Sequence, residues 1–160
     1  MVSPVANVVL LAQAQTEPSG GTSSSGMVFW LTLLVIMALG TLHLVYTFRG
    51  SKLTPRDAAL QARMAEVPLV ITRQTTVWRA WVGFNASHSM GAILFGLIYG
   101  FLSNAYPEIL FNSPFLLVVG LAMLGGLAVL GKVYWFRIPF GGIVISLACY
   151  LASIATWWWP

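Results

Sequence analysis

Four long apolar blocks separated by short polar segments dominate the pattern of the chain. They cover residues 27–48, 78–103, 114–135 and 140–159. A helix rises about 1.5 Å per residue, so each block is long enough to cross a hydrocarbon core of about 30 Å. The pattern therefore predicts an all-α fold, an antiparallel four-helix bundle in the membrane, within one domain over residues 27–160. A tight turn is expected at 106–108.

The polar segment between the first two blocks predicts a helix of its own. Thr54 is suited to cap a helix, Pro55 to occupy its first position, and Asp57 to stabilise the positive end of the helix as a helix-start residue. Three apolar residues then follow at helical spacing: Leu60, Met64 and Val67. A short amphipathic helix lying on the membrane surface is the expected structure.

Residues 1–26 differ from the rest of the chain. A brief apolar run at 5–11 is followed by a polar stretch rich in Gly and Ser. Ala12-Gln13-Ala14 resembles a signal-peptidase site, but the apolar run is short and has no positive region before it. We expect a disordered extension or a true translation start at Met27, in preference to a weak cleaved signal.

The positions of the charged residues predict how the chain is oriented in the membrane. The chain is 58% hydrophobic and only 8% charged, whereas soluble domains are about a quarter charged. All eight basic residues lie in or beside the first and third connections: Arg49, Lys52, Arg56, Arg63, Arg73, Arg79, Lys132 and Arg137. Cytoplasmic loops carry the excess of Lys and Arg, so loops 49–78 and 132–138 are expected in the cytoplasm, with both termini outside the inner membrane. Without a basic groove or aromatic reader motif, nucleic acid is not an expected partner.

Small residues predict how the helices pack. Lipid supplies no hydrophobic force between helices, so close approach through small side chains matters more. The predicted packing residues are Ala92, Gly96 and Gly100 in the second block, and Gly142, Ser146 and Ser153 in the fourth. The third block carries Ala122 and Gly126, with Gly120, Gly125 and Gly131 nearby. Cys149, the single cysteine, shares the fourth-block seam and is expected to be an inert packing residue.

Two histidines lie inside the apolar blocks. His43 is six residues from Arg49, roughly 9 Å along a helix, and His88 is nine residues from Arg79, roughly 13 Å. Both are therefore expected at similar depth on neighbouring helices. An ionisable residue within a span is a functional candidate. The candidate ligand-binding residues are His43, Asn85, Ser87 and His88.

Three interpretations of this centre stay open. The histidines form a neutral hydrogen-bond network that fixes packing, they ligate a b-type haem with one imidazole each, or they form a site for a small molecule or a proton. No third ligand completes a metal site. The carboxylates lie outside the blocks and no catalytic motif is present, so no catalytic residue is predicted: Glu17, Asp57, Glu66 and Glu108 are the acidic residues.

Several local motifs carry a resemblance. They are Gly40-Thr41-Leu42-His43-Leu44, Pro55-Arg56-Asp57-Ala58, Gly83-Phe84-Asn85-Ala86-Ser87-His88-Ser89 and Tyr134-Trp135-Phe136-Arg137-Ile138-Pro139. Over residues 30–155 the chain resembles a family of small bacterial four-pass membrane proteins, similar in layout to the DoxX-like group. The resemblance implies the four-helix fold and makes both histidine segments part of the family pattern. It implies no activity.

The expected function is that of a non-enzymatic accessory or structural membrane component, as a subunit of a larger complex or as a homo-oligomer. One alternative is a binder of a lipophilic small molecule or cofactor, such as quinone or haem, at His43 and His88. Another is a small membrane redox enzyme or a proton-linked transporter that uses the same residues.

Overall fold

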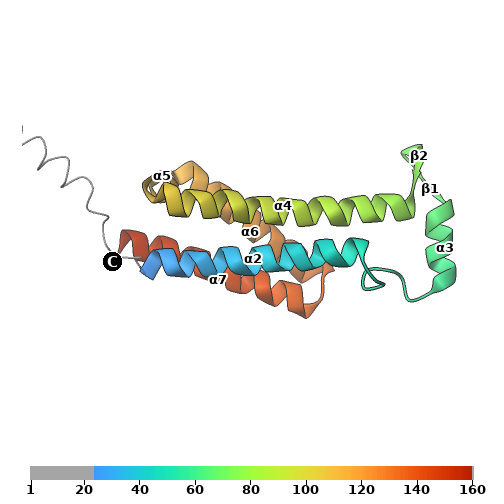
Figure 1. The fold of residues 1–160 in the computed structure, drawn as a ribbon, viewed down its shortest axis with the longest axis horizontal. Coiled ribbons are helices and arrows are strands. Elements are labelled where there is room, and N and C mark those ends of the chain that lie inside the picture. Colours follow the sequence, from blue (N-terminus) through green and yellow to red (C-terminus); the bar gives the residue numbers. More distant parts are fainter. Residues whose placement is uncertain (1–23, 160) are drawn as a thin grey trace, which may run out of the picture.

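The computed structural model describes residues 24–159, and it is mostly helical (Figure 1). In chain order the elements are α2 (Ser24–Phe48), α3 (Ala58–Glu66), β1 (Pro68–Leu69), β2 (Thr72–Thr76), α4 (Val77–Ala105), α5 (Pro107–Asn112), α6 (Pro114–Tyr134) and α7 (Arg137–Trp158). Four of these helices, α2, α4, α6 and α7, are long and apolar enough to cross a membrane. The predicted four-helix membrane bundle is confirmed.

Most of the predicted amino-terminal extension, residues 1–23, lies outside the described residues. Helix α2 already begins at Ser24, three residues before the expected start. Helix α7 begins at Arg137 rather than at Phe140. Such differences arise because a polar first turn can be helical without being apolar.

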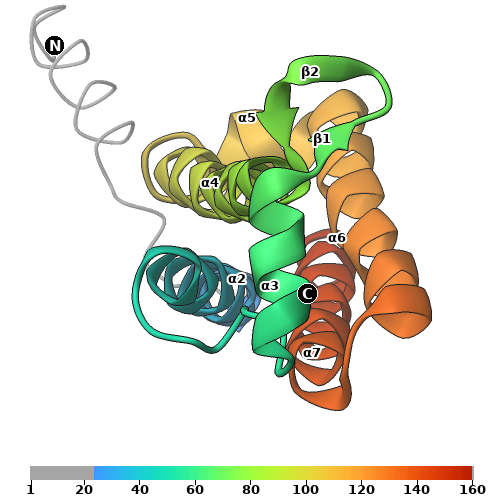
Figure 2. The ribbon, with the colours of Figure 1, turned by 90° about the vertical axis from the view of Figure 1, so that its right-hand side faces the viewer.

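The long helices are arranged around α2. Helix α2 packs along both α4 and α7, and α6 packs along α7. Viewed along the bundle, the order is therefore α4, α2, α7, α6 (Figure 2). Helix α5 contacts both α4 and α6 at one end of the bundle. The sequence predicts only a tight turn there, whereas Pro107 opens a six-residue helix.

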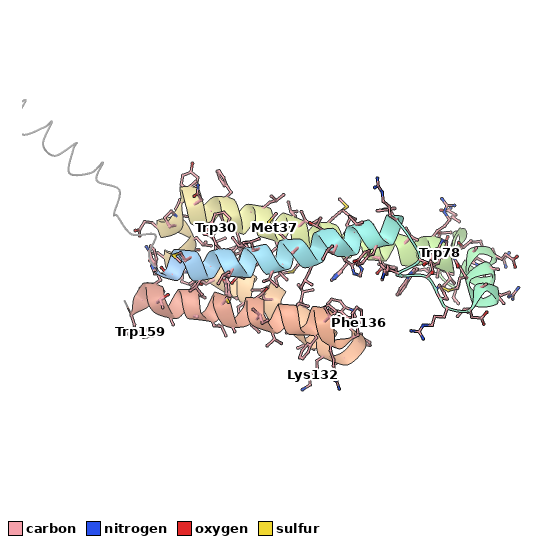
Figure 3. All side chains as sticks on the ribbon, turned by 60° about the horizontal axis from the view of Figure 1, so that its bottom comes forward. Trp30, Met37, Trp78, Lys132, Phe136 and Trp159 are labelled. Atoms are coloured by element: carbon pink, nitrogen blue, oxygen red, sulfur yellow. The ribbon has the colours of Figure 1, made fainter. Side chains whose placement is uncertain are left out.

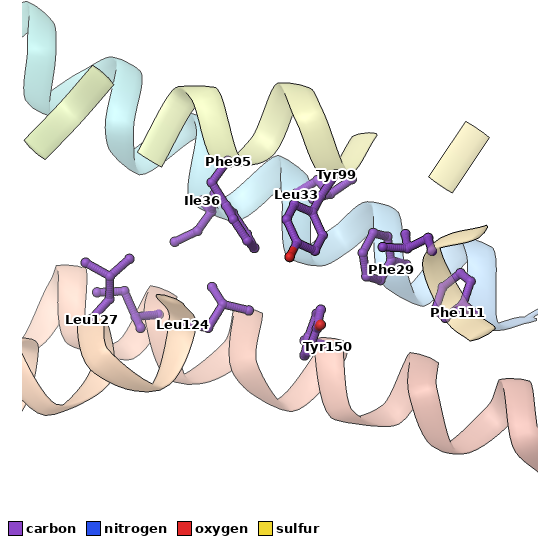
Figure 4. Packing of buried hydrophobic residues seen from close by; sticks show 11 residues of the cluster. Phe29, Leu33, Ile36, Phe95, Tyr99, Phe111, Leu124, Leu127 and Tyr150 are labelled. Carbon is purple, nitrogen blue, oxygen red and sulfur yellow. The ribbon is translucent and has the colours of Figure 1, made fainter. Parts of the chain in front are cut away.

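An aromatic core fills the bundle near α5 (Figure 4). Phe29 of α2 meets Phe111 of α5 edge-on, with ring centroids 5.2 Å apart. Two tyrosine hydroxyls reach backbone carbonyls of α6: Tyr99 donates to Leu116 at 2.7 Å and Tyr150 to Leu117 at 2.8 Å. Each phenol is thus satisfied inside an apolar core.

Small residues bring α2 close to α4 and α7. A Cβ on Gly40 would lie 3.1 Å from the Cβ of Ala92, and one on Gly142 would lie 2.8 Å from Leu39 Cδ1. Thr32 and Ser146 exchange hydrogen bonds across α2 and α7, each hydroxyl donating to the backbone carbonyl of the other, at 3.1 and 3.3 Å. Of the other residues singled out for packing, four are buried: Gly96, Gly100, Ser146 and Ser153.

The packing expectation for α6 is wrong at Ala122 and Gly126 and confirmed for two of the glycines near them. Ala122 and Gly126 are exposed, and the buried glycines of this helix are Gly120 and Gly131. The phenol of Tyr150 would meet a Cβ at Gly120, and Phe140 would lie 3.3 Å from one at Gly131. Helix α6 carries glycine and alanine on more than one face, so composition does not show which face meets α7.

The connection between α2 and α4 also begins differently from the expectation. Helix α3 starts at Ala58, where the carboxylate of Asp57 accepts a hydrogen bond from the Ala59 backbone at 2.9 Å. Thr54 is not the cap, and its hydroxyl donates to the Ser51 carbonyl instead. Strands β1 and β2 then form an antiparallel hairpin that leads into α4. Helix α3 lies across the end of the α2–α4 pair (Figures 1 and 2).

We call the end of the bundle that carries α3 and the hairpin the connector end. The long helices end at different levels there. Helices α6 and α7, with 21 and 22 residues, are about 31 and 33 Å long, whereas the 29 residues of α4 extend about 43 Å. Trp78 accordingly lies farther out along the bundle than Lys132 and Phe136 at the α6–α7 turn (Figure 3). Part of α4 therefore extends beyond the length that a hydrocarbon core requires.

Candidate functional site at the connector end

The two histidines predicted from the sequence lie side by side. His43 of α2 and His88 of α4 have ring centroids 5.5 Å apart, with one ring nearly perpendicular to the other. About one turn away, Gly40 and Ala92 let the two helix backbones approach each other. This close packing of α2 on α4 is what brings the imidazoles together.

Asn85 fixes the orientation of the His43 ring. Its amide nitrogen donates to the Trp81 carbonyl at 2.7 Å, so its Oδ1 points to His43 Nε2, at 2.8 Å. An amide oxygen only accepts hydrogen bonds. In this arrangement His43 Nε2 is the donor, so Asn85 holds one ring of the histidine pair in place.

Trp135 completes the histidine cluster from a third element. It caps the end of α6, and its indole lies 4.9 Å from the His88 ring, centroid to centroid, in an edge-on contact. The sequence does not predict Trp135 as a site residue. Tryptophan near Lys132 and Arg137 at a helix end is typical of an interfacial anchor, and that role is compatible with a contact to His88.

The contact with Trp135 also shows where the histidine cluster lies along the length of the bundle. Because Trp135 ends α6, His88 lies level with the end of a helix that is just long enough to span the hydrocarbon. The eleven residues of α4 that precede His88, 77–87, extend roughly 16 Å farther. Spacing from Arg79 alone suggests a deeper centre, whereas the contact with Trp135 places the histidine pair level with the end of α6.

A pocket of about 290 Å³ opens directly beside this cluster. It lies between the end of α2, the connection that follows it, α3 and the first turns of α4. Its walls combine aromatic and polar side chains, among them Tyr46, Thr47, Gln61, Trp78, Trp81 and Asn85. Asn85 thus lines the pocket and also hydrogen-bonds to His43.

A second pocket, of about 380 Å³, lies on the other side of Trp81. Lys52, Pro55 and Met64 contribute to it, and both pockets share Leu53, Thr54 and Trp81. The indole N–H of Trp81 donates to the Leu53 carbonyl at 3.1 Å. This bond holds the connection against α4, and Trp81 lines both pockets.

Ser87 is not brought into the cluster. It is exposed, and its hydroxyl donates to the Phe84 carbonyl of its own helix at 3.1 Å. Successive residues on a helix point about 100° apart, so Ser87 cannot share the face of His88. Of the four candidate residues, the structure groups His43, Asn85 and His88.

The arrangement does not fit a haem between the two imidazoles. A porphyrin would have to enter between α2 and α4, yet these helices are in van der Waals contact at Gly40 and Ala92. His43 Nε2 is already committed to Asn85. Within residues 24–159, no three His, Cys, Asp or Glu side chains gather in a group that could hold a metal ion.

Comparison with known proteins returned no relative. The chain matches no family model, no curated protein and no solved structure. The site is therefore interpreted from its own geometry.

Proposed function

We propose that the chain is a non-enzymatic accessory membrane protein that holds an amphipathic small molecule at its connector end. One observation carries the proposal: the pocket of about 290 Å³ is lined by Asn85, the residue that hydrogen-bonds to His43. Small-molecule sites are commonly concave, with apolar or aromatic walls and a few placed polar groups. Trp78 and Trp81 supply the walls, and Asn85 supplies a polar group that is already oriented.

The level of the pocket favours an amphipathic occupant. It lies beyond the end of α6, along the part of α4 that extends past the length a hydrocarbon core requires, and tryptophan side chains suit the interfacial layer because they are apolar with one polar atom. A molecule with a polar head and an apolar body matches walls that combine aromatic and polar side chains. Lipids and quinones belong to this class.

The proposal also covers the cellular location and the orientation of the protein in the membrane. The eight-to-none distribution of basic residues supports a cytoplasmic connector end with both termini outside. The resemblance to small bacterial four-pass proteins supports the bacterial inner membrane as the location. An accessory role would be exercised within a complex or a homo-oligomer.

Native mass spectrometry after extraction in mild detergent, with lipid and quinone analysis, tests the proposal. We expect a small molecule to copurify with the wild-type protein and to be lost from Asn85→Leu. Ser87→Ala is the matched control, because Ser87 is on the same helix but exposed and bonded only to its own helix. Its occupancy should equal that of the wild type.

A further variant guards against a folding defect in Asn85→Leu. Gln61 lines the pocket from α3 and has no part in the histidine cluster, so Gln61→Ala should reduce occupancy while the unfolding temperature stays unchanged. The proposal is rejected if no molecule copurifies, or if both pocket variants retain it fully.

A further inference from the structure

We propose that the bound molecule is an anion, with a phosphate or carboxylate head on the Lys52 side of Trp81 and its apolar body against Trp78 and Trp81. This inference rests on the proposed function and assigns the chemical class of its ligand. It arises from the second pocket, which the histidine cluster does not explain.

The two pockets adjoin each other at a single side chain and share three lining residues. Trp81 lines both, and its N–H bond to the Leu53 carbonyl places Lys52, the preceding residue, at the mouth of the second pocket. A molecule of modest size can therefore contact the indole and the Lys52 ammonium together. The volumes of about 290 and 380 Å³ suit a small molecule or a lipid head rather than a folded protein partner.

Charge complementarity selects an anion. The connector end carries all eight Lys and Arg side chains and only two carboxylates, Asp57 and Glu66. Both carboxylates are already engaged, since Asp57 caps α3 and Glu66 pairs with Arg63 at 3.6 Å. That pair is the one salt bridge within residues 24–159. Lys52 therefore lines its pocket without a carboxylate partner, as a point charge suited to a phosphate or carboxylate oxygen.

Helix α3 also favours an anionic ligand, because it brings no carboxylate to either pocket. The Gln61 and Met64 side chains, one turn apart on α3, line the first and the second pocket respectively. Neither brings a negative charge to the surface around Trp81. An anionic head would meet Lys52 and neutral polar atoms there, and no repelling carboxylate lines either pocket.

Binding to defined probes tests the inference. Protein stripped of lipid in mild detergent is titrated with dioleoyl phosphatidylglycerol, dioleoyl phosphatidylcholine or glycerol 3-phosphate, and bound species are quantified by native mass spectrometry. We expect phosphatidylglycerol to bind about tenfold more tightly than phosphatidylcholine, the change that one charge-assisted contact supplies. Lys52→Gln should lose that preference. Arg73→Gln, with the same change in net charge on β2 and outside both pockets, should keep it within about twofold.

The probes also separate the source of the anion. Displacement of phosphatidylglycerol by glycerol 3-phosphate assigns the site to soluble phosphate esters, and resistance to displacement assigns it to lipids; both outcomes support an anion site. Equal binding of the two lipids, or equal losses in Lys52→Gln and Arg73→Gln, overturns the anion inference. In that case a molecule that is still lost from Asn85→Leu keeps the proposed function intact, whereas a wild-type protein that copurifies with nothing removes the proposed function itself.

Discussion

The imidazole of His88 lies edge-on against the indole of Trp135, with 4.9 Å between the ring centroids. The contact joins the middle of α4 to the end of α6, two helices that are also joined by α5 and by the hydrogen bond from Tyr99 to the Leu116 carbonyl. It places the histidine cluster level with the end of α6, beside the pocket that Asn85 lines.

A packing role for His88 predicts a specific pattern of stability. His88→Ala removes the ring contacts to Trp135 and His43, and we expect it to lower the free energy of unfolding by about 1–3 kcal/mol. His88→Phe keeps an aromatic edge and should stay within about 0.5 kcal/mol of the wild type. Reversible unfolding in mixed detergent measures both. An unchanged stability of His88→Ala would remove the packing role and favour a ligand role.

The buried face of α6 predicts opposite effects for one substitution at two positions. Gly120→Ala places a methyl group against the phenol of Tyr150 and should cost about 1–3 kcal/mol. Gly126→Ala on the exposed face meets no atom within 4 Å and should be neutral or stabilise the helix by up to about 1 kcal/mol. The same unfolding assay compares them. Equal costs would mean that the face assigned to α7 is wrong.

The exchanged hydrogen bonds between α2 and α7 predict additive losses. Thr32→Val and Ser146→Ala each remove one hydroxyl that donates to a backbone carbonyl, so each should cost about 0.5–1.5 kcal/mol. Because each substitution leaves the other bond intact, the double variant should lose about the sum of the two. A double-mutant cycle with coupling well above about 0.5 kcal/mol would show that the hydroxyls bond to each other instead.

Orientation is testable by cysteine labelling. In a Cys149→Ala background, Lys52→Cys reports on the connector end and Glu108→Cys on α5, and both positions are exposed. We expect a membrane-impermeant maleimide to label Glu108→Cys in intact cells and Lys52→Cys only after lysis, as the distribution of basic residues predicts. The reverse result would invert the proposed topology.

The sequence predicts the histidine site only in part. His43, Asn85 and His88 are identifiable because polar side chains in an apolar helix are costly and therefore few. Trp135 and Trp81 are missed because aromatic residues at helix ends have a sufficient explanation as interfacial anchors. Lys52 is missed for a similar reason, since the topology already accounts for its charge. The contacts of Trp81 and Lys52 depend on how the connection folds back over α4, and that of Trp135 depends on where α6 ends beside His88.

The four apolar helices and the cation-rich connections are properties of the sequence by itself. They follow from local physics, since the length and apolarity of each segment decide whether it can span a bilayer. The order of α4, α2, α7 and α6, the buried face of α6, the α5 turn and the two pockets beside Trp81 are decided only by the tertiary structure. In lipid, apolar surface on every side of a helix is equally acceptable, so the choice of neighbours depends on close contacts such as Gly40 with Ala92 and Gly120 with Tyr150. Those contacts form between residues far apart in the chain, and no local pattern specifies them.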